Sequence, residues 1–111
     1  MSSVAVNTKP EFISVIIPAK NAAAHLAACL QAVLRQELLQ PGSDYEIILV
    51  DDGSNDETAA IASDFGVRVI GQSNAGPAAA RNHGARLATG QILAFTDADC
   101  IPAPGWLAAL I

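Results

Sequence analysis

The chain has 111 residues, of which 51% are hydrophobic and 15% are charged. This length and composition fit one globular domain with a real core and exclude a largely disordered chain. Eleven acidic residues against six basic ones give a formal charge of −5, and the scattered basic residues leave no basic face that would follow a nucleic-acid backbone.

Cysteine usage and hydropathy bear on the compartment. Cys29 and Cys100 lie far apart and form no Cys-x-x-Cys or His-containing ligand spacing, which indicates ordinary reduced thiols in a cytoplasmic protein. No apolar run approaches the ~20 residues that a membrane-spanning helix needs, and the first residues lack the basic-then-apolar order of a signal peptide. We therefore expect no membrane contact by this segment; a membrane anchor would have to lie beyond its end.

The first part of the chain predicts a strand followed by a helix. Residues 1–11 are polar and show no periodicity, so we expect a flexible N-terminal lead. Residues 12–17 are β-branched and almost continuously apolar, which predicts a strand that ends at Pro18. Asn21 is expected to cap a helix that runs to about Gln36, because apolar residues recur there at helical spacing.

The middle of the chain predicts two more strands around a second helix. Residues 45–50, which are apolar from Ile47 onward and rich in β-branched side chains, form the second predicted strand. Ser54 with Glu57 three residues later is a capping box, which predicts a helix over residues 55–64. Residues 67–70 then predict a short third strand.

The last third of the chain continues this alternation. The Gly76-Pro77 pair is expected to open an alanine-rich helix over residues 77–88, because proline suits the first helical turn. Residues 92–96 form a short apolar run that predicts a fourth strand. Residues 105–111 begin what looks like another helix but stop on an apolar residue without a cap, so we expect the first part of a longer protein.

The order of the predicted elements defines a fold class. Strands that alternate with helices predict one α/β domain over residues 12–111, with a mostly parallel sheet and right-handed crossovers. Open sheets of this kind bind ligands beyond the carboxyl ends of their strands. The second strand ends at Asp51 and Asp52, and only one of these should face a ligand, because adjacent strand residues face opposite sides.

The fourth predicted strand ends at the sequence Asp97-Ala98-Asp99. Side chains two residues apart on an extended segment point the same way, so Asp97 and Asp99 face one site together. Two carboxylates this close raise each other's proton affinity unless a cation lies beside them. Magnesium prefers one or two carboxylates together with phosphate oxygens, which predicts a divalent metal that carries a substrate's phosphates. The alternative is that both aspartates cap the turn that follows.

Four segments in register, residues 15–21, 46–56, 74–84 and 95–99, resemble family 2 glycosyltransferases with a GT-A fold. The weight of the resemblance comes from the four motifs together, since each alone is short. It implies a Rossmann-like three-layer fold with a mostly parallel sheet, truncated here to the nucleotide-diphospho-sugar-binding half. The acceptor-binding region and the catalytic base would lie beyond residue 111, so this segment alone should transfer no sugar.

The resemblance also implies roles for individual residues. Those assigned to the substrate are Pro18, Ala19, Asn21, Asp52, Arg81 and Asp97. Backbone groups of the first two would line the nucleotide base, Asp52 would hydrogen-bond the base, and Arg81 would lie near the base or the phosphates. Asp97 would approach the ribose or the sugar, while Asp99, with Asp97 beside it, would coordinate Mn²⁺ or Mg²⁺ that bridges the diphosphate.

The implied activity is the transfer of a sugar from a nucleoside-diphosphate donor, expected to be a UDP-sugar, to an unidentified glycan, lipid or protein acceptor. Two positions depart from the family pattern. Lys20 stands where an aromatic residue is usual, so a flexible cation replaces a ring that would stack on the base, and Ala22 stands where an acidic residue often follows the asparagine. An incomplete domain would expose the apolar face against which its missing half packs, so self-association is expected.

Two other functions use the same residues. A phosphatase of the haloacid dehalogenase type also has an Asp-x-Asp after a strand, but there the motif follows the first strand. A non-catalytic nucleotide-binding or regulatory module would explain Asp51 and Asp52 as a receiver-like acidic pocket, yet residues 70–72 offer no acid after the third strand.

His25 and His83 have no second ligand at a useful spacing and are expected to be structural or solvent-exposed.

Overall fold

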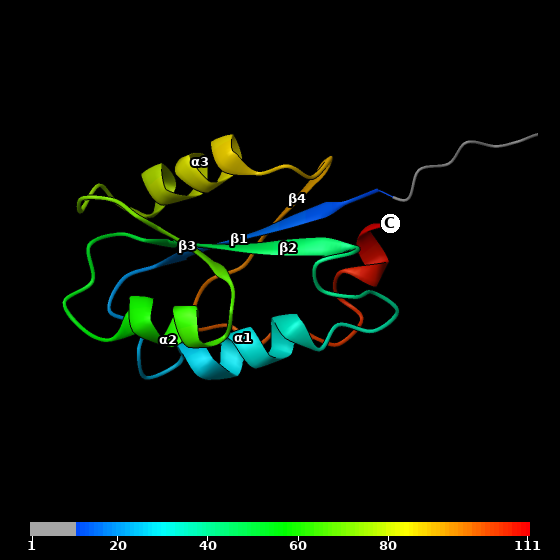
Figure 1. Cartoon of the computed structure of the whole chain (residues 1–111), viewed down its shortest axis with the longest axis horizontal. Helices are drawn as coiled ribbons and strands as arrows, with labels where there is room; N and C mark the ends of the chain where they lie inside the picture. The colour runs from blue at the N-terminus through cyan, green and yellow to red at the C-terminus, as the bar shows by residue number, and fades with distance from the viewer. Residues whose placement is uncertain (1–10) are drawn as a thin grey trace, which may run out of the picture.

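The structure is a computed structural model that describes residues 11–111, so most of the expected N-terminal lead lies outside the described residues. Strands and helices alternate along the chain (Figure 1). The strands are β1 (Ile13–Ala19), β2 (Tyr45–Asp51), β3 (Arg68–Gly71) and β4 (Ile92–Phe95). The helices are α1 (Leu26–Leu34), α2 (Thr58–Asp64), α3 (Pro77–Leu87) and the short 3₁₀ helix η1 (Ala108–Leu110).

The sheet has the strand order β3-β2-β1-β4, and all of its strands run parallel. This confirms the predicted α/β fold with a parallel sheet. The chain moves outward from β1 to β2 and β3 and then returns to the other side of β1, so the strand order reverses between β1 and β4. All residues of β1 are buried, which explains why its sequence is almost continuously apolar rather than alternating.

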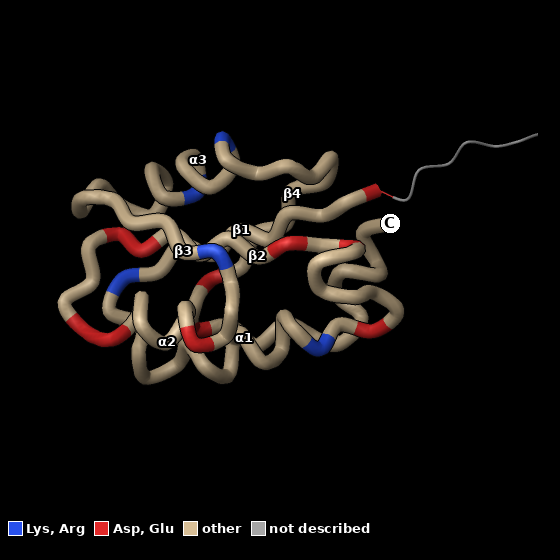
Figure 2. The backbone as a smooth tube through the Cα atoms, in the orientation of Figure 1, with Lys and Arg blue, Asp and Glu red and all other residues tan. Residues whose placement is uncertain are grey.

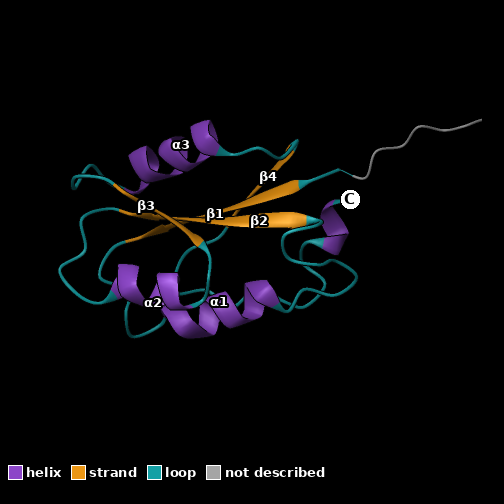
Figure 3. Ribbon diagram, viewed as in Figure 1, coloured by secondary structure: helices purple, strands orange, loops and turns teal. Residues whose placement is uncertain are grey.

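Helices cover both faces of the sheet and produce three layers (Figures 1 and 3). α1 and α2 lie against one face, where Val15 of β1 shares the larger hydrophobic core with Leu30 of α1. α3 lies against the other face, where Val50 of β2 packs with Ala80. The sheet therefore has two apolar faces, as strands buried on both sides require.

α1 begins at Leu26 rather than at Asn21 and ends at Leu34 rather than at Gln36. Asn21 has a φ of 50°, a left-handed conformation that asparagine tolerates better than most residues. Its side-chain oxygen accepts a hydrogen bond of 2.8 Å from the amide of Asn55 in the loop after β2. The predicted cap is therefore wrong, because the Asn21 side chain joins two loops instead of starting a helix.

The predicted capping box at Ser54 is wrong for the same physical reason. α2 begins only at Thr58, and the Ser54 hydroxyl oxygen accepts a hydrogen bond of 2.8 Å from the amide of Asn21. The N-cap of α2 is Glu57, whose side chain makes no capping bond, while the carboxylate of Asp56 just before it accepts the Thr58 amide at 3.0 Å. Bonds between the two loops thus replace the local motif.

Two other predicted boundaries change. Pro18 does not end β1, which continues to Ala19. The backbone groups of successive β1 residues point alternately toward β4 and β2: the Ile16 carbonyl bonds on the β4 side and the Ala19 carbonyl on the β2 side. The nitrogen of Pro18 therefore faces the β4 side, where the pairing of β1 with β4 has already ended at Ile16. The missing N–H therefore removes no ladder bond. The helix expected over residues 105–111 is reduced to η1.

Candidate functional site

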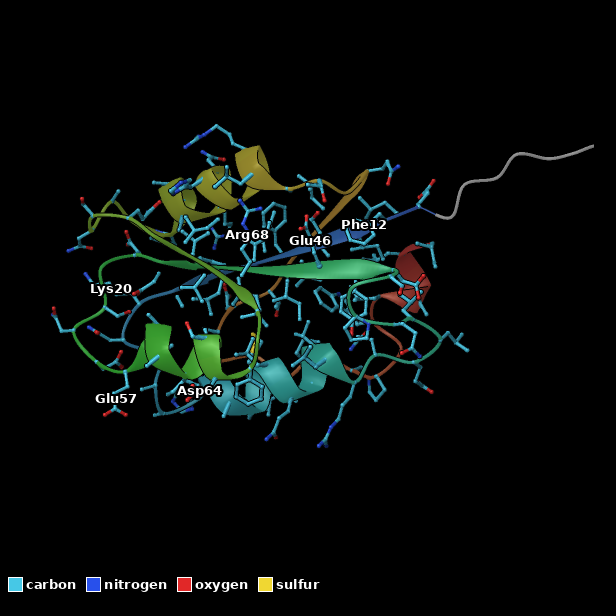
Figure 4. All side chains as sticks on the ribbon, viewed as in Figure 1. Phe12, Lys20, Glu46, Glu57, Asp64 and Arg68 are labelled. Carbon is cyan, nitrogen blue, oxygen red and sulfur yellow. The ribbon has the colours of Figure 1, made fainter. Side chains whose placement is uncertain are left out.

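The carboxyl ends of β1, β2 and β4 meet at one edge of the sheet. Because the strand order reverses between β1 and β4, this edge is the switch point at which open α/β sheets bind ligands. Figure 4 shows Lys20 at this end of the molecule and Phe12 toward the opposite end. Acidic and basic residues both occur in the loops there (Figure 2).

Two adjoining pockets open at this edge. The larger has a volume of about 340 Å³, and its lining includes Asn21, His25 and Asp99. The smaller has a volume of about 170 Å³, and its lining includes Asp52 and Pro77. The residues that line both pockets are Pro18, Ala19, Lys20 and Asp97. Ligand sites start at roughly 300 Å³, so the two pockets together have the size of a small-molecule site.

Asp52 lines the smaller pocket, although only 4% of the residue is exposed. Its Oδ1 accepts hydrogen bonds from the Gln72 side-chain amide at 2.9 Å and from the Ala75 backbone amide at 2.7 Å. Its Oδ2 accepts the Gly76 backbone amide at 2.9 Å. These hydrogen bonds hold the pKa of Asp52 below its ordinary value, and the bond from Gln72 has the largest effect, followed by the bond from the Ala75 amide. The carboxylate is therefore ionised at neutral pH and held in a fixed orientation.

The neighbouring Asp51 is used differently. Its Oδ1 accepts the backbone amide of Ser54 at 3.1 Å, which closes the turn after β2. Asp51 lines neither of the two pockets at this edge, whereas Asp52 lines one of them. The two carboxylates thus face apart, as adjacent strand residues do.

Sequence reasoning missed the residues that support Asp52 from the loop between β3 and α3. Lys20 Nζ donates a hydrogen bond of 2.6 Å to Asn74 Oδ1, which ties the loop after β1 to the loop before α3. His83 Nδ1 lies 2.9 Å from Gln72 Oε1. Asn74 and His83 lie in the segment 74–84 that resembles the family, and polar residues precede the Gly-Pro start of α3, but neither pattern says what these side chains contact.

The motif after β4 forms a compact, exposed group. Ligand atoms of Asp97, Asp99 and Cys100 all lie within 4.8 Å of one another. The Cys100 amide donates to the Asp97 carbonyl at 3.0 Å, which closes a turn and turns both aspartates toward the same region. Carboxylate oxygens are the ligands that Mg²⁺ and Mn²⁺ prefer, so the donor set fits a divalent cation. Cys100, which its sequence spacing did not connect with a metal, lies beside both aspartates.

Arg81 of α3 forms an ion pair with Asp97, with 3.8 Å between Nη2 and Oδ1. The two side chains are 42% and 60% exposed, so the pair contributes little to stability. Its importance lies in position, because it holds a guanidinium beside the shared wall of the two pockets. In the part of the chain that the structure describes, Asp99 has no such ion-pair partner.

Cys29 supports the backbone of the motif from α1. Its Sγ donates to the Asp97 carbonyl at 3.5 Å. Burial, followed by the nearby Cys100, raises the pKa of the Cys29 thiol to about 11. Both cysteines are free, and Cys100 is exposed while Cys29 is buried, so only one of the two thiols is open to solvent chemistry.

The loop after β1 is held in place by the loop after β2. The Ala22 amide donates to the Thr58 hydroxyl at 2.9 Å, and the Ala23 amide donates to the Asp56 carboxylate at 3.1 Å. With the two Asn21 bonds, these contacts fix the backbone of residues 20–23 against a second loop. The wall of the larger pocket is therefore preorganised rather than loose.

A parallel sheet with carboxylates at its switch point is the arrangement of an α/β protein that binds a nucleotide or another phosphorylated ligand. Residues 14–111 match the family described as Glycosyl transferase family 2. The chain belongs to this family, which confirms the resemblance found in the sequence.

Relatives with similar sequences carry the same family name. Glycosyltransferase AglE of Haloferax volcanii is 43% identical over an alignment of 102 residues that covers 86% of this chain and 33% of that protein. The uncharacterized glycosyltransferase EpsJ of Bacillus subtilis is 40% identical over an alignment of 92 residues that covers 78% of this chain and 26% of that protein. The chain thus spans about a third or less of the length of these relatives.

Solved structures share the fold. TarS 1-349 of S. aureus in complex with UDP has a TM-score of 0.83 and 27% identity over 89% of this chain and 30% of its own. The mannosyltransferase PcManGT of Pyrobaculum calidifontis, in complex with GDP-Man and Mn²⁺, has a TM-score of 0.78 and 28% identity over 87% of this chain and 30% of its own. These likenesses confirm the GT-A fold for this chain.

The family match also decides between two of the functions considered from the sequence. A haloacid dehalogenase-type phosphatase belongs to another family, and here the Asp-x-Asp motif follows β4 rather than the first strand.

None of the helices in residues 11–111 is long and apolar enough to cross a membrane.

Proposed function

We propose that residues 12–111 are the nucleotide-diphospho-sugar-binding half of a glycosyltransferase that transfers a sugar from a nucleoside-diphosphate donor to an acceptor. The observation that carries the proposal is that the ends of β1, β2 and β4 build one site with adjoining pockets. The solved relatives with UDP, UDP-GlcNAc or GDP-Man support a nucleotide-sugar donor. We expect a UDP-sugar.

The smaller pocket is the proposed site of the base. Pro18 and Ala19 offer it an apolar wall, and Asp52 offers a fixed, ionised acceptor. Asn21 lines the larger pocket beside the motif after β4, so we assign it to the ribose, phosphate or sugar side of the donor. Arg81 lies within ion-pair distance of Asp97 and is placed to meet the phosphates.

The cation proposed for this site is Mn²⁺ or Mg²⁺, held by Asp99 with Asp97 beside it. The exposed carboxylates within 4.8 Å of one another fit such an ion, and two related structures were solved with Mn²⁺. When bound, the cation would act as a Lewis acid that offsets charge on the leaving diphosphate. Asp99 is proposed as the main ligand because Arg81 already pairs with Asp97.

Three parts of the proposal concern the whole protein. The acceptor is an unidentified glycan, lipid or protein. The base that deprotonates the acceptor is expected beyond residue 111, so the 111-residue chain should bind donor without steady transfer. We place the protein in the cytoplasm, because both cysteines are free thiols.

The first experiment is calorimetric titration of the folded chain with UDP, GDP and TDP, each with and without Mn²⁺. We expect Mn²⁺-dependent binding of one nucleotide, and we expect Asp99→Ala to remove the Mn²⁺ dependence. Asp99 is exposed, so this variant should fold normally. Asp64→Ala is the matched control, since Asp64 is also exposed but ends α2.

The outcomes separate the alternatives. Equal affinity and equal Mn²⁺ response in wild type and Asp99→Ala would contradict the metal assignment. Binding of nucleotide without any effect of Mn²⁺ would favour a metal-independent, non-catalytic nucleotide-binding module. Steady sugar transfer to an added acceptor by this chain alone would overturn the expectation that the acceptor half is required.

A further inference from the structure

Asp52 has an unusual setting for a carboxylate, because the residue is only 4% exposed. A buried carboxylate is normally paired with a cation or fully hydrogen-bonded. No ion pair of residues 11–111 includes Asp52, so its charge is stabilised chiefly by neutral donors at close range, with a smaller contribution from the charge of Lys20 in the same pocket. Of those donors, two are backbone amides and one is the side chain of Gln72.

The distribution of these donors leaves one position free. A carboxylate has about two acceptor positions on each oxygen. Oδ1 already accepts from Gln72 and from the Ala75 amide, whereas Oδ2 accepts only from the Gly76 amide. A ligand donor that reaches Asp52 from the smaller pocket must therefore bond to Oδ2, and the orientation of the carboxylate decides whether Oδ2 is available.

Gln72 is itself held from two sides. Its backbone amide donates to the Asp51 carbonyl at 2.9 Å, which fixes the residue beside the end of β2. Its Oε1 lies 2.9 Å from Nδ1 of His83 on α3. An amide oxygen only accepts, so Nδ1 of His83 carries the proton in this contact. This bond keeps the amide Nε2 of Gln72 toward Asp52.

We propose that Gln72, oriented by His83, is a positioning residue that holds the Asp52 carboxylate toward the donor pocket and thereby sets the affinity for the donor's base. The proposal rests on the function proposed above. It adds a chain of contacts from α3 through the end of β3 to the pocket, in which only Asp52 touches the ligand. The Gln72 bond is also the first of the influences that lower the pKa of Asp52.

This arrangement makes Gln72 different from a residue that only fills space. If Gln72 is replaced by leucine, Oδ1 loses a donor, and the carboxylate gains freedom to rotate away from the pocket. The pKa of Asp52 should then rise. The ionised carboxylate is the acceptor for the base. When the pH is lowered, the variant should therefore lose nucleotide binding at a higher pH than the wild type does.

The test uses Gln72→Leu and Gln72→Glu, with Gln31→Leu and Gln31→Glu as matched controls on the exposed face of α1. UDP binding in the presence of Mn²⁺ is measured calorimetrically from neutral pH into the acid range. The titration of the Asp52 carboxyl carbon is followed by NMR in the free protein. Loss of one hydrogen bond to a charged group corresponds to about tenfold or more in affinity.

We expect Gln72→Leu to weaken UDP binding about tenfold at neutral pH. The pH below which binding is lost, the acid limb of the binding curve, should move to a higher value. The midpoint of the Asp52 titration should rise as well. Gln72→Glu should do so more strongly, because two carboxylates would then face each other. His83→Ala should have a smaller effect, and His83→Gln, whose amide can donate to Gln72, should restore part of the affinity. The Gln31 variants should match the wild type.

The readouts distinguish failure of this inference from failure of the proposed function. If wild type binds UDP and Gln72→Leu shows the same affinity, acid limb and Asp52 titration, the positioning role is refuted while the proposed function stands. If wild type binds no nucleotide, the proposed function fails, and an unchanged Asp52 titration in Gln72→Leu would refute the positioning role as well. If Gln72→Leu does not fold, the isosteric Gln72→Glu decides by the same two measurements.

Discussion

Gly84 tests whether α3 is positioned by direct contact with the sheet. The residue is buried in α3, and an added Cβ would lie 2.6 Å from Ile16 Cγ2 and 3.2 Å from Val50 Cγ2. Overpacking of this kind costs about 1–3 kcal/mol, and the closer distance places Gly84→Ala near the upper end. Alanine gains about 1 kcal/mol of helix propensity over glycine. The expected net loss is about 2 kcal/mol in the free energy of unfolding.

For a chain of this length that loss corresponds to a fall in Tm of about 8 °C, measured by circular dichroism in thermal and urea unfolding. Ala60→Gly on the exposed face of α2 measures the propensity contribution separately. Ile16→Ala removes the atom nearest to the added Cβ, so the double variant should be more stable than the two single losses predict. Equal or higher stability of Gly84→Ala, or full additivity with Ile16→Ala, would refute the reasoning.

Two other predictions concern the surface around the site. Cys100 is exposed and Cys29 is buried with a pKa of about 11, so a thiol reagent should modify Cys100 rapidly and Cys29 only on unfolding. Mn²⁺ with UDP should slow the labelling of Cys100, and equal labelling rates for the two thiols in the native chain would contradict the structure. Leu93 and Phe95 of β4 are 41% and 44% exposed, so sedimentation should show self-association that increases with protein concentration. Phe95→Glu should reduce this association, whereas the control Leu38→Glu, at an exposed position elsewhere, should not. A monomer at all concentrations would exclude this contact.

The strands of this fold could be predicted because their signal is both local and strong. Each strand contains a short run of mainly apolar residues, and the helix after Gly76 begins where proline predicts it. The position of β4 beside β1 is a different matter, since nothing in residues 92–95 specifies a neighbour. That pairing depends on tertiary packing, and only the structure shows it.

The failed predictions share a cause. Asn21 and Ser54 both have the chemistry of a helix cap, and each uses its side chain on the other loop instead. The polar character of Gln72 did not reveal its role, because that role depends on Asp52 and His83, which are distant from it in the sequence. Hydrogen bonds between loops are tertiary information, and local patterns do not contain it.

The charges at the site give a physical reason to expect cation-dependent binding. A nucleoside diphosphate is strongly anionic, and it would meet the carboxylates of Asp52, Asp97 and Asp99 in the two pockets. Among residues 11–111, the basic side chains placed against these carboxylates are Lys20, which lines both pockets, and Arg81, which already pairs with Asp97. Asp52 cannot relieve the repulsion by taking up a proton at neutral pH, since its pKa lies below the ordinary value, chiefly through the Gln72 bond. A divalent ion at Asp99 would reverse the local sign where the diphosphate must lie, so donor affinity should depend on the cation more than on either basic side chain.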